Sequence, residues 1–261
     1  MRRIGTLTLS VVVLAVPVGF VLYQLIPKDS ATKATVSQAV VKFRKEMKGA
    51  ASYPKHPEAQ ITPFGVYRYS TRGSEAIDSF AVTAGHNYNG ISTVSLIPIP
   101  CGVRERWQPL VERWFEGRLC VKPKSTRVVA VRDFHQFFEQ SKLVSYACTG
   151  DSSPYASKLR PGHGWQSKCR SAKGTVTSNV EVVGLEKVKV AGKPIEAVHL
   201  RASATMKGDP EGTDTQDSWI RRADGLLLRR VDSSKAHVDV AGGGTFTERY
   251  EINLISTKPQ R

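Results

Sequence analysis

The chain has 261 residues, of which 40% are apolar, and a formal net charge of +15 at pH 7. This composition is that of an ordinary globular protein and excludes a disordered chain. No run of five like charges occurs, which excludes a basic tail of the kind that binds nucleic acid. The positive charge fits a partner with an anionic surface, such as lipid headgroups, cell-wall polymer or nucleic acid. A uniformly basic, well-solvated surface gives the same net charge.

The stretch from Ile4 to Pro27 contains no charged side chain and follows Arg2 and Arg3. As a helix it would extend about 36 Å, which exceeds the hydrocarbon core of a bilayer, about 30 Å thick. We therefore predict a cytoplasmic stub over residues 1–3 and a single transmembrane helix over residues 4–27, with the C-terminal domain outside the cytoplasm. The alternative is a cleaved signal peptide, although signal peptides have a shorter apolar stretch of about 7–15 residues.

Four cysteines occur, at Cys101, Cys120, Cys148 and Cys169, and none forms a C-x-x-C pair. This spacing disfavours zinc ribbons and thioredoxin-like redox sites. Four cysteines allow three disulfide connectivities, and we favour the sequential one, Cys101–Cys120 and Cys148–Cys169, because each pair brackets a local loop or hairpin. Such bonds persist in an oxidising compartment, which agrees with export; the alternative is four reduced thiols in a cytoplasmic domain.

Residues 28–63 are predicted to form a juxtamembrane helix and a linker. Thr35 to Gln38 resembles a capping box, and apolar side chains then recur at helical spacing up to Met47. This amphipathic helix, over residues 35–48, would pack on the protein's own core or lie on anionic lipid headgroups; we favour packing. The prolines at positions 54, 57 and 63 indicate a linker before the next domain.

Residues 64–261 are predicted to form an extracytoplasmic β-rich domain. Apolar and polar side chains alternate over residues 198–206 and 246–254, which is the period of half-buried strands. Residues 64–70 and 91–97 are also strand-like. Turn signals are Ala191-Gly192-Lys193, Ala223-Asp224-Gly225 and Gly242-Gly243-Gly244. We predict a mainly β fold: a curved antiparallel sheet, as an open half-barrel or a sandwich, with one or two short helices.

The segment between Cys101 and Cys120 is predicted to be a hairpin. If the two cysteines face each other, Trp107 lies opposite Trp114, which is a favourable aromatic pair. The same register sets Glu105 opposite Glu116, which is unfavourable, and a bulge near Pro109 could relieve it.

No pattern in the sequence marks a catalytic, metal-binding or cofactor-binding residue. The six histidines include no pair three or four residues apart, and His199 falls on the polar face of a strand, where we interpret it as a surface histidine. Gly150-Asp151-Ser152-Ser153 lacks the closing glycine of a nucleophile elbow, and the glycines at 242–244 lack the Lys-Ser/Thr of a phosphate loop. We therefore predict that the protein is not an enzyme and has no cofactor.

Several segments resemble a group of membrane-anchored bacterial envelope proteins of uncharacterised function. They are Ala39 to Arg44, Gly65 to Tyr69, the Cys101 to Cys120 stretch with its two tryptophans, Val188 to Pro194, Ser218 to Ile220 and Gly225 to Arg229. More remotely, the C-terminal half is similar to lipoprotein carriers, whose open half-barrels hold acyl chains. The resemblance implies a curved sheet and an apolar ligand, and it implies no catalytic residue.

Together these features predict a non-enzymatic domain held at the cell membrane that binds an apolar or lipidic ligand in a concave sheet. The alternatives are a scaffold that binds another envelope protein, and a hydrolase with an unmarked active site. The expected partners are the membrane and a lipid or an envelope protein. Because the domain is exported, we expect no nucleic-acid partner.

Overall fold

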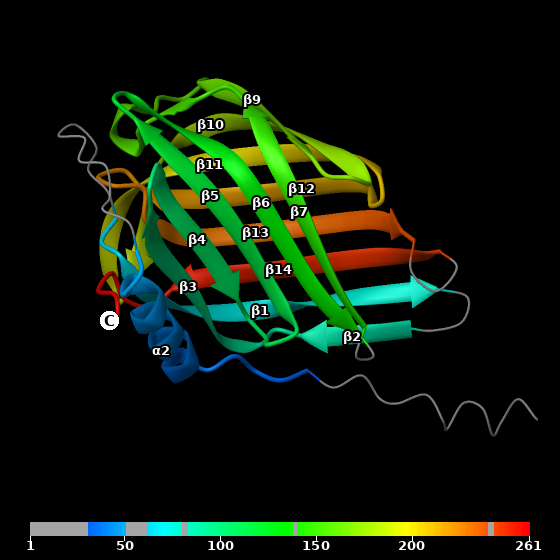
Figure 1. Cartoon of the computed structure of the whole chain (residues 1–261). Coiled ribbons are helices and arrows are strands. Elements are labelled where there is room, and N and C mark those ends of the chain that lie inside the picture. Colours follow the sequence, from blue (N-terminus) through cyan, green and yellow to red (C-terminus); the bar gives the residue numbers. More distant parts are fainter. Residues whose placement is uncertain (1–30, 51–61, 80–82, 138–139, 240–242) are drawn as a thin grey trace, which may run out of the picture.

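The computed structural model describes residues 31–50, 62–79, 83–137, 140–239 and 243–261 (Figure 1). The described residues are mainly strand, which confirms the predicted class. The helices are α2 (Val36–Met47) and the 3-10 helix η1 (Ala156–Lys158). The strands are β1 (Gly65–Ser79), β2 (Thr83–Asn87), β3 (Gly90–Ile99), β4 (Gly102–Gln108), β5 (Arg113–Lys122), β6 (Ser125–Phe137), β7 (Gln140–Gly150), β8 (Ser153–Pro154), β9 (Gly164–Arg170), β10 (Gly174–Val190), β11 (Lys193–Gly208), β12 (Glu211–Arg221), β13 (Leu227–Val238) and β14 (Gly244–Leu254).

In the described part of the chain, the strands form one 14-stranded sheet that closes on itself (Figure 1). Its order is β14-β13-β12-β11-β10-β9-β7-β6-β5-β4-β3-β1, and β14 then pairs with β1, with Tyr69 opposite Leu254. Strand β2 pairs with the second half of β1, and β8 pairs with β6. The expectation of an open half-barrel or a sandwich is therefore wrong. The sheet is a closed barrel, because its first and last strands hydrogen-bond to each other.

Side chains alternate between the barrel interior and its outer face, as the period of two predicts. In β14, Tyr250, Ile252 and Leu254 are buried, whereas Arg249, which precedes Tyr250, is exposed. The Tyr250 ring stacks on Trp107 of β4, with 4.2 Å between the ring centroids. Since β4 and β14 are not neighbours in the sheet, this contact crosses the barrel and joins its opposite walls.

Helix α2 lies on the outside of the barrel beside β1 and β3 (Figure 1). Thr35 and Gln38 form the expected capping box at its start. Val40 and Phe43 are buried against Val66, an outward-facing residue of β1. The amphipathic stripe therefore packs on the protein's own core, as we favoured, because it covers apolar side chains that would otherwise face water.

The β4–β5 hairpin is present, but its register differs by one residue from the prediction. Trp107 lies opposite Phe115 and not Trp114, and Arg106 lies opposite Glu116. The reason is that Cys101 occupies the turn before β4, so that Gly102 is the residue opposite Cys120. This register replaces the unfavourable pair of glutamates with an ion pair of opposite charges.

Disulfide bonds join Cys101 to Cys120 and Cys148 to Cys169, which is the sequential connectivity. The first bond ties the start of the β4–β5 hairpin. The second joins β7 to β9, which are neighbours in the sheet, and both of its cysteines are buried. Two disulfides indicate an oxidising compartment outside the cytoplasm.

The chain reaches the barrel at the turn between β4 and β5. The backbone N–H of Thr32 donates to Glu112 Oε2 at 2.8 Å, and the N–H of Val111 donates to the Thr32 carbonyl at 2.9 Å. Lys33 forms a β-bridge with Leu110 in the same turn. None of the helices in the described ranges is long and apolar enough to cross a membrane. The predicted transmembrane segment and the stub before it lie outside the described residues.

Candidate functional site

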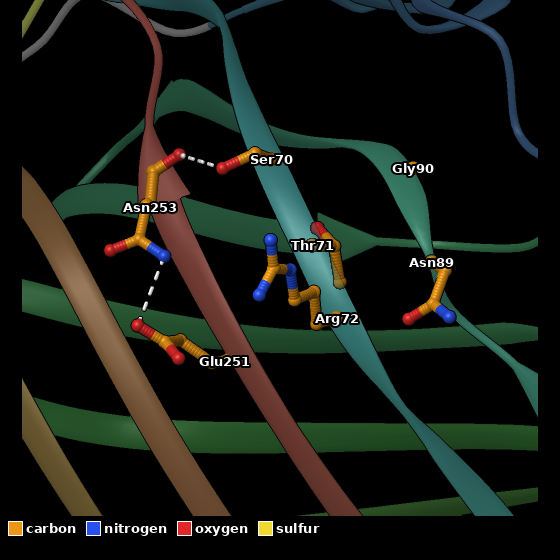
Figure 2. Close-up of a pocket in the computed structure, with 7 residues that line it drawn as sticks. All are labelled: Ser70, Thr71, Arg72, Asn89, Gly90, Glu251 and Asn253. Carbon is orange, nitrogen blue, oxygen red and sulfur yellow. Dashed lines mark hydrogen bonds between the residues drawn. The ribbon is translucent and has the colours of Figure 1, made fainter.

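A polar groove of about 570 Å³ lies on the barrel wall where β1, β14 and the bend before β3 meet (Figure 2). The residues that line it are Ser70, Thr71, Arg72, Asn89, Gly90, Glu251 and Asn253. Most of them carry a hydroxyl, amide, guanidinium or carboxylate group. The groove can therefore both donate and accept hydrogen bonds, which suits a polar ligand.

The pairing of β1 with β14 places four of these side chains together. Ser70 lies opposite Asn253, and Arg72 lies opposite Glu251. Residues two apart on a strand point to the same face, so all four project from the outer face of the barrel. The groove is thus built on two paired strands, which hold its side chains more firmly than loops would.

Hydrogen bonds hold the side chains on one wall of the groove, whereas the Arg72 guanidinium has no ion-pair partner among the described residues. The Asn253 amide donates to Glu251 Oε1 at 3.1 Å, and the Ser70 hydroxyl donates to the Asn253 carbonyl at 3.4 Å (Figure 2). Arg229 Nε also donates to Glu251 Oε1, at 2.9 Å. Arg72 is exposed and forms no ion pair with another residue of the described ranges. Its guanidinium is therefore available to a ligand.

The opposite wall is the bend at Asn89 and Gly90. The Gly73 N–H donates to Asn89 Oδ1 at 3.1 Å, and the ammonium group of Lys33 donates to the Asn89 carbonyl. Gly90 has a φ of 130°, a backbone conformation that residues with a side chain rarely adopt. A Cβ at this position would also lie 3.0 Å from Lys33 Nζ. The bend therefore needs glycine, and it brings the start of the described chain to the groove.

A network of ionisable side chains crosses the barrel interior and is a second candidate for chemistry. Glu75 of β1 is fully buried and contacts two histidines, His86 Nδ1 at 2.7 Å and His135 Nδ1 at 2.6 Å. Burial alone would raise the pKa of Glu75, but His135 and His86 lower it to about 2. Burial and Arg113 lower the pKa of His135, but Asp133 and Glu75 outweigh them and raise it to about 9. At neutral pH this histidine is therefore an imidazolium between two carboxylates.

Arg113 links this network to the far wall of the barrel. Its Nε donates to Glu248 Oε1 of β14 at 2.9 Å, and its guanidinium also donates to Asp133. The Tyr88 hydroxyl donates to Glu248 Oε1 at 2.7 Å. Among the described residues, each of these charges has a partner, and no serine, threonine or cysteine takes part. No local pattern in the sequence marks this network, and its geometry indicates cross-bracing of the barrel.

A pair of aspartates lies on β12 and β13: Asp232 is buried and Asp214 is partly buried. Burial, followed by the charge of Glu248, raises the pKa of Asp214 to about 6. Burial and the neighbouring Asp214 raise the pKa of Asp232 well above its ordinary value. The Gln216 amide donates to Asp232 Oδ2 at 3.0 Å. Burial and mutual repulsion therefore favour protonation of this pair.

His199 is not the simple surface histidine expected from the sequence. Its ring stacks on Trp219 at 4.3 Å and is largely covered. Its Nδ1 contacts Glu186 Oε1 at 2.9 Å, and its Nε2 contacts Asp217 Oδ1 at 2.7 Å. The three polar residues come from three adjacent strands, β10, β11 and β12. A single sequence does not reveal this partnership, because neighbours across strands are distant along the chain.

The two weak motifs of the sequence do not form a site. The hydroxyl groups of Ser153 and Thr126 hydrogen-bond at 2.9 Å, where β8 pairs with β6. Gly243 and Gly244 lead into β14, and Gly242 lies outside the described residues. Within the ranges described, no cluster of three or more His, Cys, Asp or Glu side chains could hold a metal ion.

No known protein family matches the sequence, and no curated protein matches it. One solved structure that resembles the chain is the hypothetical lipoprotein YmcC from Escherichia coli (K12), at 15% sequence identity and a TM-score of 0.36. The match covers 88% of this chain and 100% of the lipoprotein. These values are too low to support a shared function, so the function is inferred below from the chain's own geometry.

Proposed function

We propose that this chain is a non-enzymatic, membrane-anchored domain of the cell envelope that binds a polar, hydroxyl-bearing ligand, such as a sugar unit, in the groove between β1 and β14. The observation that carries the proposal is the lining of that groove. Arg72 offers unpaired donors, Asn253 an amide and Glu251 carboxylate oxygens, all on one face. A sugar hydroxyl both donates and accepts, so it can pair with each of these groups.

The location of the ligand differs from the sequence-based expectation of an acyl chain inside a concave sheet. Opposite walls of the closed barrel are joined through Trp107 and Tyr250 and through Arg113 and Glu248. A ligand entering there would have to separate buried ion pairs, which costs several kcal/mol each. The outer groove needs no such opening, and its polar lining favours a polar ligand over an apolar one.

The histidine geometry supports a non-enzymatic role. Both ring nitrogens of His135 contact carboxylates, and so do both ring nitrogens of His199. A histidine that activates a hydroxyl nucleophile needs one ring nitrogen facing that hydroxyl. These two histidines are therefore held as structural partners.

The anchoring part of the proposal depends on the stretch from Ile4 to Pro27 and on the disulfides. The stretch is long enough to span a bilayer as a helix, and the disulfides support an oxidising compartment for the barrel. A fusion of alkaline phosphatase to the C-terminus should be active in cells, because that reporter folds only outside the cytoplasm. An inactive fusion of normal abundance would contradict the proposed topology.

Ligand binding is tested with the purified full-length protein in mild detergent on a panel of immobilised sugars, followed by titration calorimetry with any sugar that binds. The variant Arg72→Ala should weaken binding about tenfold, the value of one charge-assisted hydrogen bond. Arg68→Ala is the matched control, since Arg68 is an exposed arginine of the same strand that does not line the groove.

Three outcomes separate the hypotheses. Binding that Arg72→Ala weakens and Arg68→Ala leaves unchanged supports the groove. Absence of sugar binding, together with uptake of a fluorescent fatty-acyl probe, would overturn it in favour of an apolar ligand in the interior. Discrete protein adducts after crosslinking in cells, without sugar binding, would favour a scaffold that binds an envelope protein.

A further inference from the structure

Four arginines surround one buried carboxylate on the outer face of β4, β5 and β6. Glu116 is fully buried, and its oxygens lie 2.7 Å from Arg106, 3.5 Å from Arg118, 3.7 Å from Arg104 and 3.9 Å from Arg132. Glu46 of α2 also pairs with Arg104. Two carboxylates cannot neutralise four guanidinium groups, so this face keeps a net positive charge. The side chains of Arg118 and Arg132 are 41% and 34% exposed, which leaves donors open to an anion.

Apolar side chains form a row beside these arginines. Trp114, Phe134 and Leu143 are consecutive cross-strand neighbours on β5, β6 and β7. The Trp114 and Phe134 rings stack at 5.3 Å, and Arg106 and Arg132 lie 4.1 Å and 5.5 Å from the centre of the Trp114 ring. We call the four arginines and these three apolar residues the Arg–Trp face.

The Arg–Trp face lies next to the point where the chain reaches the barrel. Thr32 hydrogen-bonds to Glu112 and Val111 in the β4–β5 turn, and Trp114 follows that turn by two residues. Thr32 is the fifth residue after Pro27, the end of the predicted span. Fully extended, five residues reach at most about 18 Å. The turn and the face beside it must therefore lie close to the lipid surface if the span is correct.

We propose that the Arg–Trp face lies on anionic lipid headgroups of the membrane in which the chain is anchored. This inference rests on the anchoring part of the proposed function. Arginine pairs with phosphate through two hydrogen bonds, and tryptophan favours the level of the headgroups. A soluble anionic polymer would fit the arginines but would leave Leu143 and Val111, which are 45% and 44% exposed, facing water. Lipid satisfies both the charged and the apolar parts of the face.

The test uses the full-length protein reconstituted into vesicles whose lipids carry a nitroxide quencher on the headgroup. One set is phosphatidylcholine alone, and the other contains added phosphatidylglycerol. Quenching of Trp114 is obtained as the difference between the wild type and the variant Trp114→Phe. It should be stronger in the anionic vesicles and should decline at high salt, because salt screens exposed charges.

Two charge variants sharpen the test. Arg118→Gln combined with Arg132→Gln should reduce the lipid-contacting population about fivefold for each charge removed. The matched control combines Arg170→Gln with Arg249→Gln, which are exposed arginines of β9 and β14. The control variant should retain the wild-type thermal transition, since Arg170 and Arg249 are exposed. The Arg118/Arg132 variant should remain folded, because Arg106 still pairs with the buried Glu116 at 2.7 Å.

Equal Trp114 quenching in neutral and anionic vesicles would overturn the inference. So would charge-dependent binding of the detergent-solubilised protein to a sulfated polysaccharide, lost in the Arg118/Arg132 variant, without any lipid quenching; that result would assign the face to a polymer. Extraction of the protein from native membranes by alkaline carbonate is a separate result, because it would contradict the anchor itself and not only the contact of this face.

Discussion

His135 should make the stability of the barrel depend on pH between 6.5 and 9. Its folded pKa is raised to about 9 by Asp133 and Glu75, against burial and Arg113, whereas the ordinary value is 6.5. A group whose folded pKa is raised contributes its full stabilisation below its unfolded pKa, and the contribution disappears as pH rises through the folded value. The gap between the two pKa values corresponds to roughly 3 kcal/mol.

The assay is urea unfolding of the full-length protein in mild detergent, with the disulfides intact, followed by tryptophan fluorescence. The free energy of unfolding of the wild type should fall by roughly 3 kcal/mol between pH 6.5 and 9. His135→Gln cannot titrate, so this fall should be absent in the variant. The difference between the two proteins should be largest at pH 6.5 and small at pH 9.

His237→Gln is the matched control, because His237 is an exposed histidine of β13. This variant should keep the wild-type pH dependence. If His135→Gln also keeps it, the charged imidazolium between Glu75 and Asp133 is refuted as its source. A companion variant, Glu75→Gln, removes one carboxylate partner of His135, so the midpoint of the pH dependence should move to a lower pH.

Three further changes test other parts of the structure. Replacing Cys148 and Cys169 by alanine should lower the free energy of unfolding by about 3 kcal/mol in urea titrations, because the bond closes a loop of 21 residues; an unchanged midpoint would contradict this. Trp107→Ala should cost about 3–5 kcal/mol, because the indole is buried and stacked across the barrel. The folded pKa of Asp214 is raised to about 6, so the wild type loses stability as pH rises from 4 to above 6 and the partly buried carboxyl ionises. Asparagine does not ionise, so the variant Asp214→Asn should gain stability relative to the wild type over this pH range. An unchanged difference across that range would disprove the raised pKa.

Features with a local signal could be predicted from the sequence. The alternation over residues 246–254 places Tyr250 and Ile252 on one face and Arg249 on the other, and the structure has this arrangement. The capping box and the apolar stripe of α2 likewise lie within a few turns of one helix. The disulfide connectivity follows from short separations along the chain, which keep each pair in one local unit.

Features that depend on distant pairing could not be predicted. Closure of the barrel requires β14 to pair with β1, and the sequence of neither strand indicates which strand it pairs with. The hairpin register depended on one residue, because Cys101 lies in a turn and not in the strand. The groove combines side chains of β1 and β14 with the Asn89 bend, so it exists only after closure.

The interior network was missed for a different reason. Glu248 has the same parity in β14 as Tyr250 and Ile252, so the alternation places its carboxylate on the inward face. A carboxylate at an inward position needs a cation from another strand, and Arg113 and Glu248 are 135 residues apart. Parity alone therefore indicated that Glu248 is buried, but only the fold identifies its partner.

The closed barrel and its interior charges together determine where this protein can act. In the described part of the chain, the twelve strands that close the barrel each pair with a strand on either side, and Arg113 and His135 tie the barrel walls together through buried carboxylates. Separating one such pair would leave an uncompensated buried charge, at a cost of about 3–5 kcal/mol. Exchange of a ligand with the interior would require several of these steps at once. The outer face requires none, and both the groove of Arg72 and the Arg–Trp face lie there. The position of the chain's first described residues would then orient both surfaces relative to the membrane.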